Sequence, residues 1–487
     1  MQSDISKKIG QATKWSSITE IATKLISPIV NMILARLLAP EAFGVVATIT
    51  MVISFSEIFT DAGFQKYIIQ HEFRDDDELD KSTNVAFLTN LFVSLLICAI
   101  IFAFRHSIAV MVGSPGLGNS ISIASILILI AAFSSIQIAR NRRSFDFKIL
   151  FYARIVSAFI PVLITIPLAF VMRNYWALLI GNFVSQGFSA IVLTWKSKWK
   201  PSFYYNFSLL KQMLSFSVWT LFESIAIWLT SYIDIFLVGS YLNEYYLGIY
   251  KTSMSVVSSC MAIITGAITP VLFSALSRYQ DDAQKFSSTY YTFQRNVAIL
   301  VFPLGVGIFC FKDLVTYVLL GSQWMEASGF IGLWGLTSSV VIVFSYFSSE
   351  VFRSKGNPKI SLFTQLLYLT IIVPALLISI RYNFEIFYTV RALIRLIMIS
   401  MLWMHFLYKF KISDVIKNVF PMMLSSLVMG LAGYGLLLCG NGWLWQILCI
   451  VLCIIVYFSF LFLCFPKTRK EVFSMAIVQK IFQKVKR

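Results

Sequence analysis

The sequence predicts an all-α integral membrane protein with about fourteen transmembrane helices. Three observations support this prediction. Of the 487 residues, 58% are hydrophobic and 13% are charged, and the mean hydropathy is +0.78. Soluble domains are roughly half apolar and a quarter charged, so the chain lies outside that class. The apolar residues gather in runs long enough to cross a bilayer, and the basic residues gather in every second loop between these runs.

All but one of the predicted spans contain the approximately 20 mostly apolar residues that a helix needs to cross a bilayer. The ninth is short as drawn, and we expect it to begin earlier, near Tyr290. The predicted spans are residues 15–37, 42–62, 84–104, 119–139, 150–172, 175–195, 214–239, 245–272, 297–311, 327–349, 360–380, 384–407, 416–438 and 442–465.

The basic residues predict the orientation of the chain. Fourteen spans place both termini on the same side, and a cytoplasmic N-terminus puts 31 of the 40 Lys and Arg residues in cytoplasmic segments. Only five lie in outer loops, as the positive-inside rule predicts. The net charge of +17 therefore reflects topology, and its scatter along the chain excludes a nucleic-acid partner. The five outer residues are Arg36, Arg105, Arg173, Lys312 and Arg381.

A weak internal repeat divides the spans into two halves. Leu38–Gly44 and Leu242–Gly248 both lie at helix junctions, and Gly44 and Gly248 are 204 residues apart, which is close to six spans. An even number of spans gives two parallel lobes, as in transporters that alternate access to a central site. We predict six-helix lobes over residues 1–200 and 201–411, two additional spans over 412–466, and a basic cytoplasmic tail over 467–487.

Ionisable residues inside the predicted spans are candidates for function, because they are costly in a bilayer and usually face a cavity or a partner. Four of the spans that the repeat pairs across the two halves carry them, on faces spaced at three and four residues. The acidic residues are candidates for cation coupling and the lysines for substrate binding. These residues are Glu20 and Lys24, Glu57 and Asp61, Glu223 and Asp234, and Lys251.

The twelfth predicted span carries Arg391 and Arg395 one helical turn apart. Arg395 lies about 16 Å along the helix from Phe384, which places it near mid-bilayer. Two like charges at this spacing repel, so they favour an anion between or opposite them. Guanidinium groups bind phosphate bidentately, which makes both arginines candidates for substrate binding. The alternative is that the intramembrane charges only pair with one another and lock helices together, Glu20 with Lys24 for example.

Cysteine and histidine patterns indicate no catalytic or metal site. The seven cysteines lie inside apolar runs without neighbouring histidines, and His71, His106 and His405 are scattered. We therefore expect no metal and no cofactor. The N-terminal apolar stretch carries Glu20, Lys24 and Asn31, so we interpret it as a first span and not as a cleaved signal.

Several segments resemble the polysaccharide flippases of the Wzx type, within the multidrug/oligosaccharidyl-lipid/polysaccharide exporter superfamily. In the first half they are Ala35–Gly44, Asp61–Phe64 and Ile68–Gln70, and in the second half Asp234–Gly239, Leu247–Tyr250 and Pro270–Leu276. The resemblance covers essentially the whole chain.

This resemblance implies a fold of two six-helix lobes with two extra C-terminal helices around a cationic cavity. The implied cargo is an undecaprenyl-pyrophosphate-linked oligosaccharide, moved across the bacterial cytoplasmic membrane with coupling to a proton or sodium gradient, in the company of other polysaccharide-assembly proteins. Two alternatives remain. One is a small-molecule or drug exporter of the same superfamily, and the other is a membrane polysaccharide polymerase or ligase, which the short outer loops disfavour.

Overall fold

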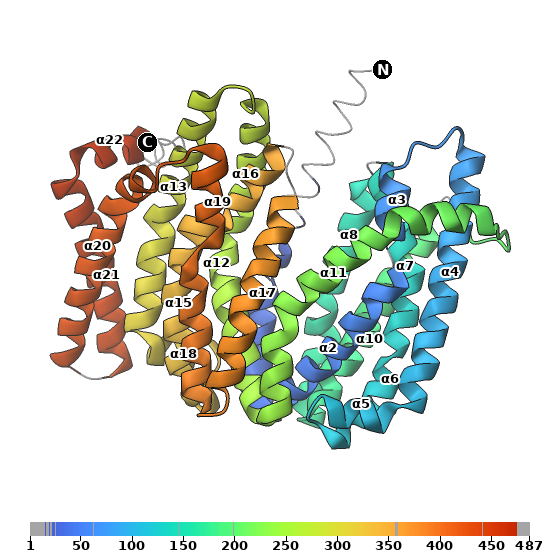
Figure 1. Ribbon diagram of the computed structural model, residues 1–487. Helices are drawn as coiled ribbons and strands as arrows, with labels where there is room; N and C mark the ends of the chain where they lie inside the picture. Colours follow the sequence, from blue (N-terminus) through green and yellow to red (C-terminus); the bar gives the residue numbers. More distant parts are fainter. Residues whose placement is uncertain are drawn as a thin grey trace, which may run out of the picture. The chain divides into compact units, whose positions relative to one another are not determined.

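The computed structural model describes residues 15, 19, 22–24, 26–61, 63–144, 146–197, 199–355, 359–440 and 442–474 (Figure 1). These residues form helices joined by short connections, and none of them lies in a β-strand. The all-α prediction is therefore confirmed. Glu20 and residues 475–487 of the predicted tail lie outside the described residues, as do the side chains of Asp61 and Glu223.

Thirteen helices among the described residues are long and apolar enough to span a membrane. They correspond to the second through fourteenth predicted spans. The first predicted span, 15–37, is described only in part, and its residues 26–37 are helical. The ninth span begins earlier than its apolar run, as expected. Helix α13 begins at Ala283, seven residues before Tyr290, where Asp282 accepts a hydrogen bond from the backbone N–H of Lys285 at 3.0 Å and caps the helix.

The helices are α2 (Pro40–Asp61), α3 (Phe64–Gln70), α4 (Asp76–Ala103), α5 (Arg105–Met111), α6 (Gly118–Ala124), α7 (Ile126–Arg143), α8 (Phe147–Ile160), α9 (Ile166–Met172), α10 (Tyr175–Lys196), α11 (Phe207–Tyr241), α12 (Glu244–Arg278), α13 (Ala283–Cys310), α14 (Lys312–Leu319), α15 (Ser328–Val341), α16 (Ser348–Ser354), α17 (Lys359–Ser379), α18 (Phe384–Ile394), α19 (Ile399–Tyr408), α20 (Ile412–Leu438), α21 (Trp443–Cys464) and α22 (Pro466–Ser474). Short 3₁₀ segments are η1 (Pro115–Leu117), η3 (Ser322–Ala327) and η5 (Arg395–Ile397), and π-helical turns are η2 (Pro161–Thr165) and η4 (Ile342–Tyr346).

Irregular turns interrupt several of the spans. In the span Phe147–Met172 the π-helical turn begins at Pro161, which has no N–H to donate to the helix ladder. The span Ser322–Ser354 contains η4. The span Phe384–Tyr408 is broken at η5, and Met398 after it has a left-handed backbone with φ of 49°. The sequence predicted an unbroken helix there, since no Gly or Pro marks the break.

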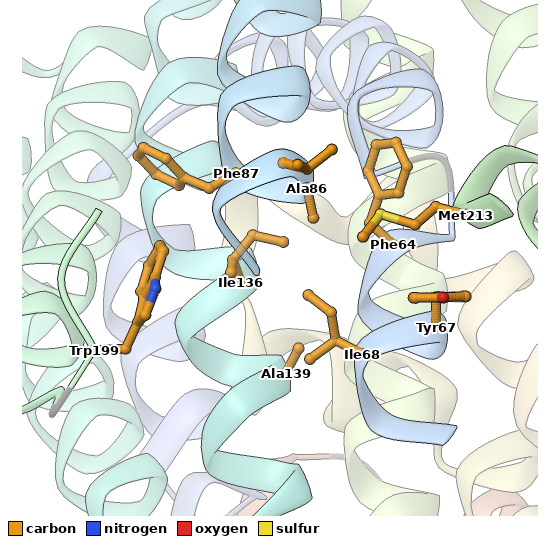
Figure 2. Packing of buried hydrophobic residues seen from close by; sticks show 10 residues of the cluster. Phe64, Tyr67, Ile68, Ala86, Phe87, Ile136, Ala139, Trp199 and Met213 are labelled. Carbon is orange, nitrogen blue, oxygen red and sulfur yellow. The ribbon is translucent and has the colours of Figure 1, made fainter. Parts of the chain in front are cut away.

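The chain divides into two compact units, the first made of residues 1–255 with 365–387 and the second of residues 256–364 with 388–487. The predicted lobe boundary at residue 200 stays a prediction. In the first unit α7 packs against α3, α4 and α10, and α11 packs against α2. A buried core joins α3, α4 and α7 with two residues that flank the start of α11, as Figure 2 shows. Its members include Phe64, Ile68, Phe87, Ile136, Trp199 and Met213.

The start of α2 crosses the start of α12 at a close backbone contact in the first unit. A Cβ atom on Gly44 would lie 1.8 Å from the carbonyl oxygen of Glu244, and one on Gly248 would lie 1.8 Å from that of Pro40. The contact is reciprocal, because Pro40 corresponds to Glu244 and Gly44 to Gly248 at the offset of 204 residues. The two segments of the repeat therefore meet each other through the glycines that defined it.

In the second unit α13 packs against α15 and α20, and α20 and α21 run side by side (Figure 1). A chain of polar groups crosses this packing. The Asn418 side chain donates to the Gln294 side chain at 3.0 Å, and Gln294 donates to the carbonyl oxygen of Val343 in η4 at 3.2 Å. Tyr457 of α21 donates to the carbonyl oxygen of Ile299 at 2.9 Å. The last two spans are thus fixed to α13 by hydrogen bonds in addition to apolar contact.

Candidate functional site

Arg391 and Arg395 lie together on one indole ring in the second unit. The guanidinium carbon of Arg395 is 3.9 Å from the ring centroid of Trp334, and that of Arg391 is 5.4 Å from it. Arg395 also donates to the hydroxyl of Ser338 at 3.1 Å. The face of a tryptophan ring attracts cations, so Trp334 offsets part of the repulsion between the two arginines.

Two helix faces with matching spacing create this cluster. On α15, Phe330, Trp334 and Ser338 follow one another at four-residue steps and share a face. The opposing face carries Tyr388, Arg391 and Arg395, with the Phe330 and Tyr388 rings 5.0 Å apart. The arginines are therefore held by packed aromatic residues and are not loose side chains on a helix surface.

The cluster lies where its span is broken. Helix α18 ends at Ile394, Arg395 begins the 3₁₀ segment, and Met398 adopts the left-handed conformation. A non-glycine residue in this conformation costs about 1–3 kcal/mol, and such strain concentrates at functional sites. Interrupted spanning helices likewise form substrate sites in transporters. The indole N–H of Trp334 is buried and has no acceptor among the described residues, so the cluster contains a hydrogen-bond donor beside two cations.

The two arginines differ in exposure. Arg391 is buried, with 7% of its surface exposed, whereas Arg395 is half-buried. Arg395 is therefore the more accessible of the two in this conformation.

In the first unit Asp234 lies near Lys251. Asp234 is fully buried on α11 and accepts a hydrogen bond from the hydroxyl of Tyr250 on α12 at 2.7 Å. It also attracts Lys251 electrostatically, and the Lys251 ammonium lies 5.6 Å from the centroid of the Tyr232 ring. A buried carboxylate that is hydrogen-bonded in this way ties the two helices together, which is the structural alternative considered for the intramembrane charges.

Glu57 has a different environment. Its carboxylate is half-buried on α2, and it has no ion pair or hydrogen bond with any residue that the structure describes. One turn earlier, Ser54 accepts a hydrogen bond from the indole of Trp228 on α11 at 3.0 Å. A carboxylate without a protein partner in a spanning helix is suited to binding a cation or a proton.

The remaining predicted site residues stay predictions. Lys24 is half-buried on the first helical segment. Asp61 ends α2 and Glu223 lies within α11, and Glu20 is outside the described residues. The structure thus brings together Arg391 with Arg395, and Asp234 with Lys251.

The sequence analysis missed the partners of these charges. Trp334 and Ser338 lie on a span without ionisable residues in its centre, and only the four-residue spacing of Phe330, Trp334 and Ser338 indicated a common face. Tyr250 was present at the end of the segment Leu247–Tyr250 that carries the family resemblance, opposite the segment that begins with Asp234. In the structure the hydrogen bond from Tyr250 to Asp234 joins these two segments.

The broken span, the buried charges and the thirteen helices of membrane-spanning length among the described residues define a polytopic helical membrane protein of the transporter type. Its fold is similar to that of the lipid II flippase MurJ, a structure solved in an inward closed conformation, with a TM-score of 0.75 and 15% sequence identity over 93% of this chain and 99% of that one. The chain belongs to the polysaccharide biosynthesis protein family, whose profile its residues 33–329 match.

Two curated relatives agree with this assignment. The succinoglycan biosynthesis transport protein ExoT of Rhizobium meliloti (strain 1021) is 24% identical over 344 residues, which are 70% of this chain and 68% of that protein. An uncharacterized membrane protein in the cps region of Klebsiella pneumoniae is 23% identical over 379 residues, which are 77% of this chain and 76% of that protein. The resemblance to polysaccharide flippases stated from the sequence is confirmed.

Proposed function

We propose that the chain is a flippase that moves oligosaccharide units linked to undecaprenyl pyrophosphate across the bacterial cytoplasmic membrane, for the synthesis of a surface polysaccharide. Membership of the polysaccharide biosynthesis family supports the class of cargo. The transport protein ExoT and the lipid II flippase MurJ, one similar in sequence and the other in fold, support transport over enzymatic synthesis. Other proteins of polysaccharide assembly are the expected partners, because they would supply and use the cargo.

The observation that carries the proposal is the arginine pair on Trp334. A pyrophosphate presents several anionic oxygens, and guanidinium groups bind such oxygens in a fixed bidentate geometry. Arg395 is half-buried and is the group expected to contact the pyrophosphate directly. Arg391, stacked on the same ring, adds positive charge behind it. The left-handed break at Met398 frees the chain from regular helix at this point, as in other transporter binding sites.

Energy for the movement comes, in this proposal, from a proton or sodium gradient that acts through Glu57. Its carboxylate has no protein partner among the described residues, whereas Asp234 is already hydrogen-bonded to Tyr250. Of these two acids, Glu57 is therefore the better coupling candidate. Replacing Glu57 by glutamine keeps the shape and removes the charge, so Glu57→Gln is expected to abolish the dependence of transport on the gradient while Asp234→Asn mainly lowers stability.

The test is complementation of bacteria that lack their own polysaccharide flippase, with the amount of surface polymer as the readout. The wild-type chain is expected to restore polymer, and the double variant Arg391→Ala/Arg395→Ala is expected to reduce it tenfold or more, since hydrogen bonds to charged groups contribute about 1.5–3 kcal/mol each. The matched control is Arg381→Ala, which removes an exposed arginine after α17. Membrane abundance is measured for every variant.

Each outcome separates the hypotheses. Loss of polymer in the double variant but not in Arg381→Ala supports the flippase and the arginine site. Restoration that survives the double variant keeps the function and refutes the site. Failure of the wild-type chain across several sugar repeats favours the drug-exporter alternative, which resistance to cationic compounds then tests.

The predicted orientation has a separate test. Single cysteines are introduced into the α3–α4 loop and the α5–η1 loop of a variant whose seven native cysteines are replaced by alanine, and are labelled from outside intact cells with an impermeant thiol reagent. The positive-inside prediction expects labelling only at the α5–η1 loop, and labelling of the α3–α4 loop would reverse the proposed topology.

A further inference from the structure

A groove on the first unit has no role in the proposed transport reaction. It has a volume of about 610 Å³ and lies between α7 and α10, with a lysine at one end. Helix α7 contributes two apolar residues and α10 contributes a glycine, an isoleucine and a tryptophan, all within membrane spans. These residues are Ile130, Phe133, Gly187, Ile191 and Trp195, followed by Lys200.

The groove is open because α10 has a glycine at its centre. A Cβ atom added to Gly187 would meet no atom within 4 Å. Ile191 and Trp195, one and two turns further along, are exposed by 67% and 75%. Since these residues belong to a membrane span, the groove faces lipid and not water.

The length of the groove matches one leaflet of the bilayer. From Gly187 to Trp195 the helix rises about 12 Å, and half of the hydrocarbon core is about 15 Å. A single acyl chain of a lipid in that leaflet therefore has room to lie along the groove, with its headgroup at the end that carries Trp195 and Lys200.

That end has a cation held in a fixed place. The ammonium of Lys200 donates to the carbonyl oxygens of Thr194 and Trp195 at 2.6 and 3.3 Å. The preceding Trp199 is buried in the core of the first unit, with its ring 5.8 Å from that of Phe87 (Figure 2). An ammonium has three N–H donors, so the donor that remains can bind an oxygen of a phosphate.

A second cation lies at the same end. The ammonium of Lys196 lies 5.8 Å from the centroid of the Trp195 ring, as expected for an interfacial aromatic residue with a basic neighbour. Basic pockets at the ends of spanning helices attract anionic headgroups. The charge sign and the apolar depth of the groove are thus both complementary to an anionic lipid.

We propose that this groove is a binding site for an anionic glycerophospholipid, with an acyl chain along α7 and α10 and its phosphate at Lys200. The site is independent of the arginine cluster and of the proposed cargo, and it would bind the lipid whichever substrate the protein carries.

The experiment is native mass spectrometry of the full-length protein in detergent, titrated with phosphatidylglycerol or with phosphatidylcholine of the same acyl chains. The wild-type protein is expected to prefer phosphatidylglycerol. Lys200→Gln removes the charge and is expected to lower that preference about fivefold, whereas Lys200→Arg keeps it.

Gly187→Leu places a side chain in the groove, where its Cβ atom meets no other atom within 4 Å, and is expected to lower the binding of both lipids. The matched control is Gly435→Leu, at another helical glycine with no atom within 4 Å of an added Cβ. Equal binding by wild type and Gly187→Leu, or equal losses in Gly187→Leu and Gly435→Leu, overturns the proposal. Displacement of phosphatidylglycerol by an equimolar polyprenyl phosphate also overturns it, because the groove then belongs to the carrier lipid.

Discussion

The reciprocal crossing of α2 and α12 makes a quantitative prediction about glycine. An alanine Cβ at Gly44 would lie 1.8 Å from a carbonyl oxygen, whereas ordinary contact begins at 3.4 Å. Gly44→Ala must therefore separate the two helix starts by about 1.6 Å, and the same holds for Gly248→Ala. Overpacking of this kind typically costs 1–3 kcal/mol, about 2 kcal/mol per variant here.

The double variant is expected to cost less than the sum of the two single variants. Both substitutions strain the same contact, so the helices that one alanine has already pushed apart leave room for the second. The assay is the thermal unfolding of purified protein in detergent, combined with the polymer assay. Gly187→Ala and Gly435→Ala are the controls, because their Cβ atoms meet no other atom within 4 Å and alanine favours helix.

Two results would refute this reasoning. One is an unfolding temperature of Gly44→Ala equal to that of Gly187→Ala, which would mean that the close contact does not exist in the membrane-extracted protein. The other is strict additivity of Gly44→Ala and Gly248→Ala, which would mean that the two glycines do not share one contact.

Three further predictions concern stability. Asn418→Ala removes the hydrogen bonds from α20 to α13 and is expected to lower the free energy of unfolding by about 1 kcal/mol, with Asn418→Gln as the partial rescue in thermal unfolding. At the start of α13, the hydrogen bond from the Lys285 backbone N–H holds the pKa of Asp282 below its ordinary value. The wild-type chain is therefore expected to be more stable than Asp282→Ala at neutral pH. This difference in stability is lost as the pH falls below about 4 and through the lowered pKa of Asp282. Met398→Gly releases the strain of the left-handed backbone and is expected to stabilise the fold by about 1 kcal/mol, whereas Met398→Ile should destabilise it. An unchanged melting temperature in both variants would show that the backbone at Met398 is not strained.

Hydropathy was sufficient to locate the spans because it measures the property that the bilayer selects. Its errors fall where an element continues beyond the apolar run. Helix α11 starts at Phe207, earlier than predicted, because Asn206 caps it by accepting hydrogen bonds from Ser208 and Leu209. Helix α13 extends to Ala283 for the same reason. These first turns are polar or amphipathic, so only their capping residues mark the helix start.

The residues of the arginine site could be predicted but their arrangement could not. The spacing of Arg391 and Arg395 indicated one helix face, and the structure places both side chains on Trp334. Trp334 lies about 60 residues earlier on another span, and no local pattern specifies that contact. The same limit applies to Asp234, whose spacing along α11 did not identify Tyr250 as its hydrogen-bond donor.

The break in the span of the arginines follows from these tertiary contacts. The segment from Arg391 to Leu402 contains neither Gly nor Pro, so its local preference is for continuous helix. Met398 nevertheless has a positive φ, a conformation that surrounding structure must stabilise. The stacking of Arg395 on Trp334 and its hydrogen bond to Ser338 supply contacts at the start of the break. Charge, strain and interrupted helix therefore occur together because the same contacts that hold the arginine also hold the break, and a ligand that engages Arg395 would act on both.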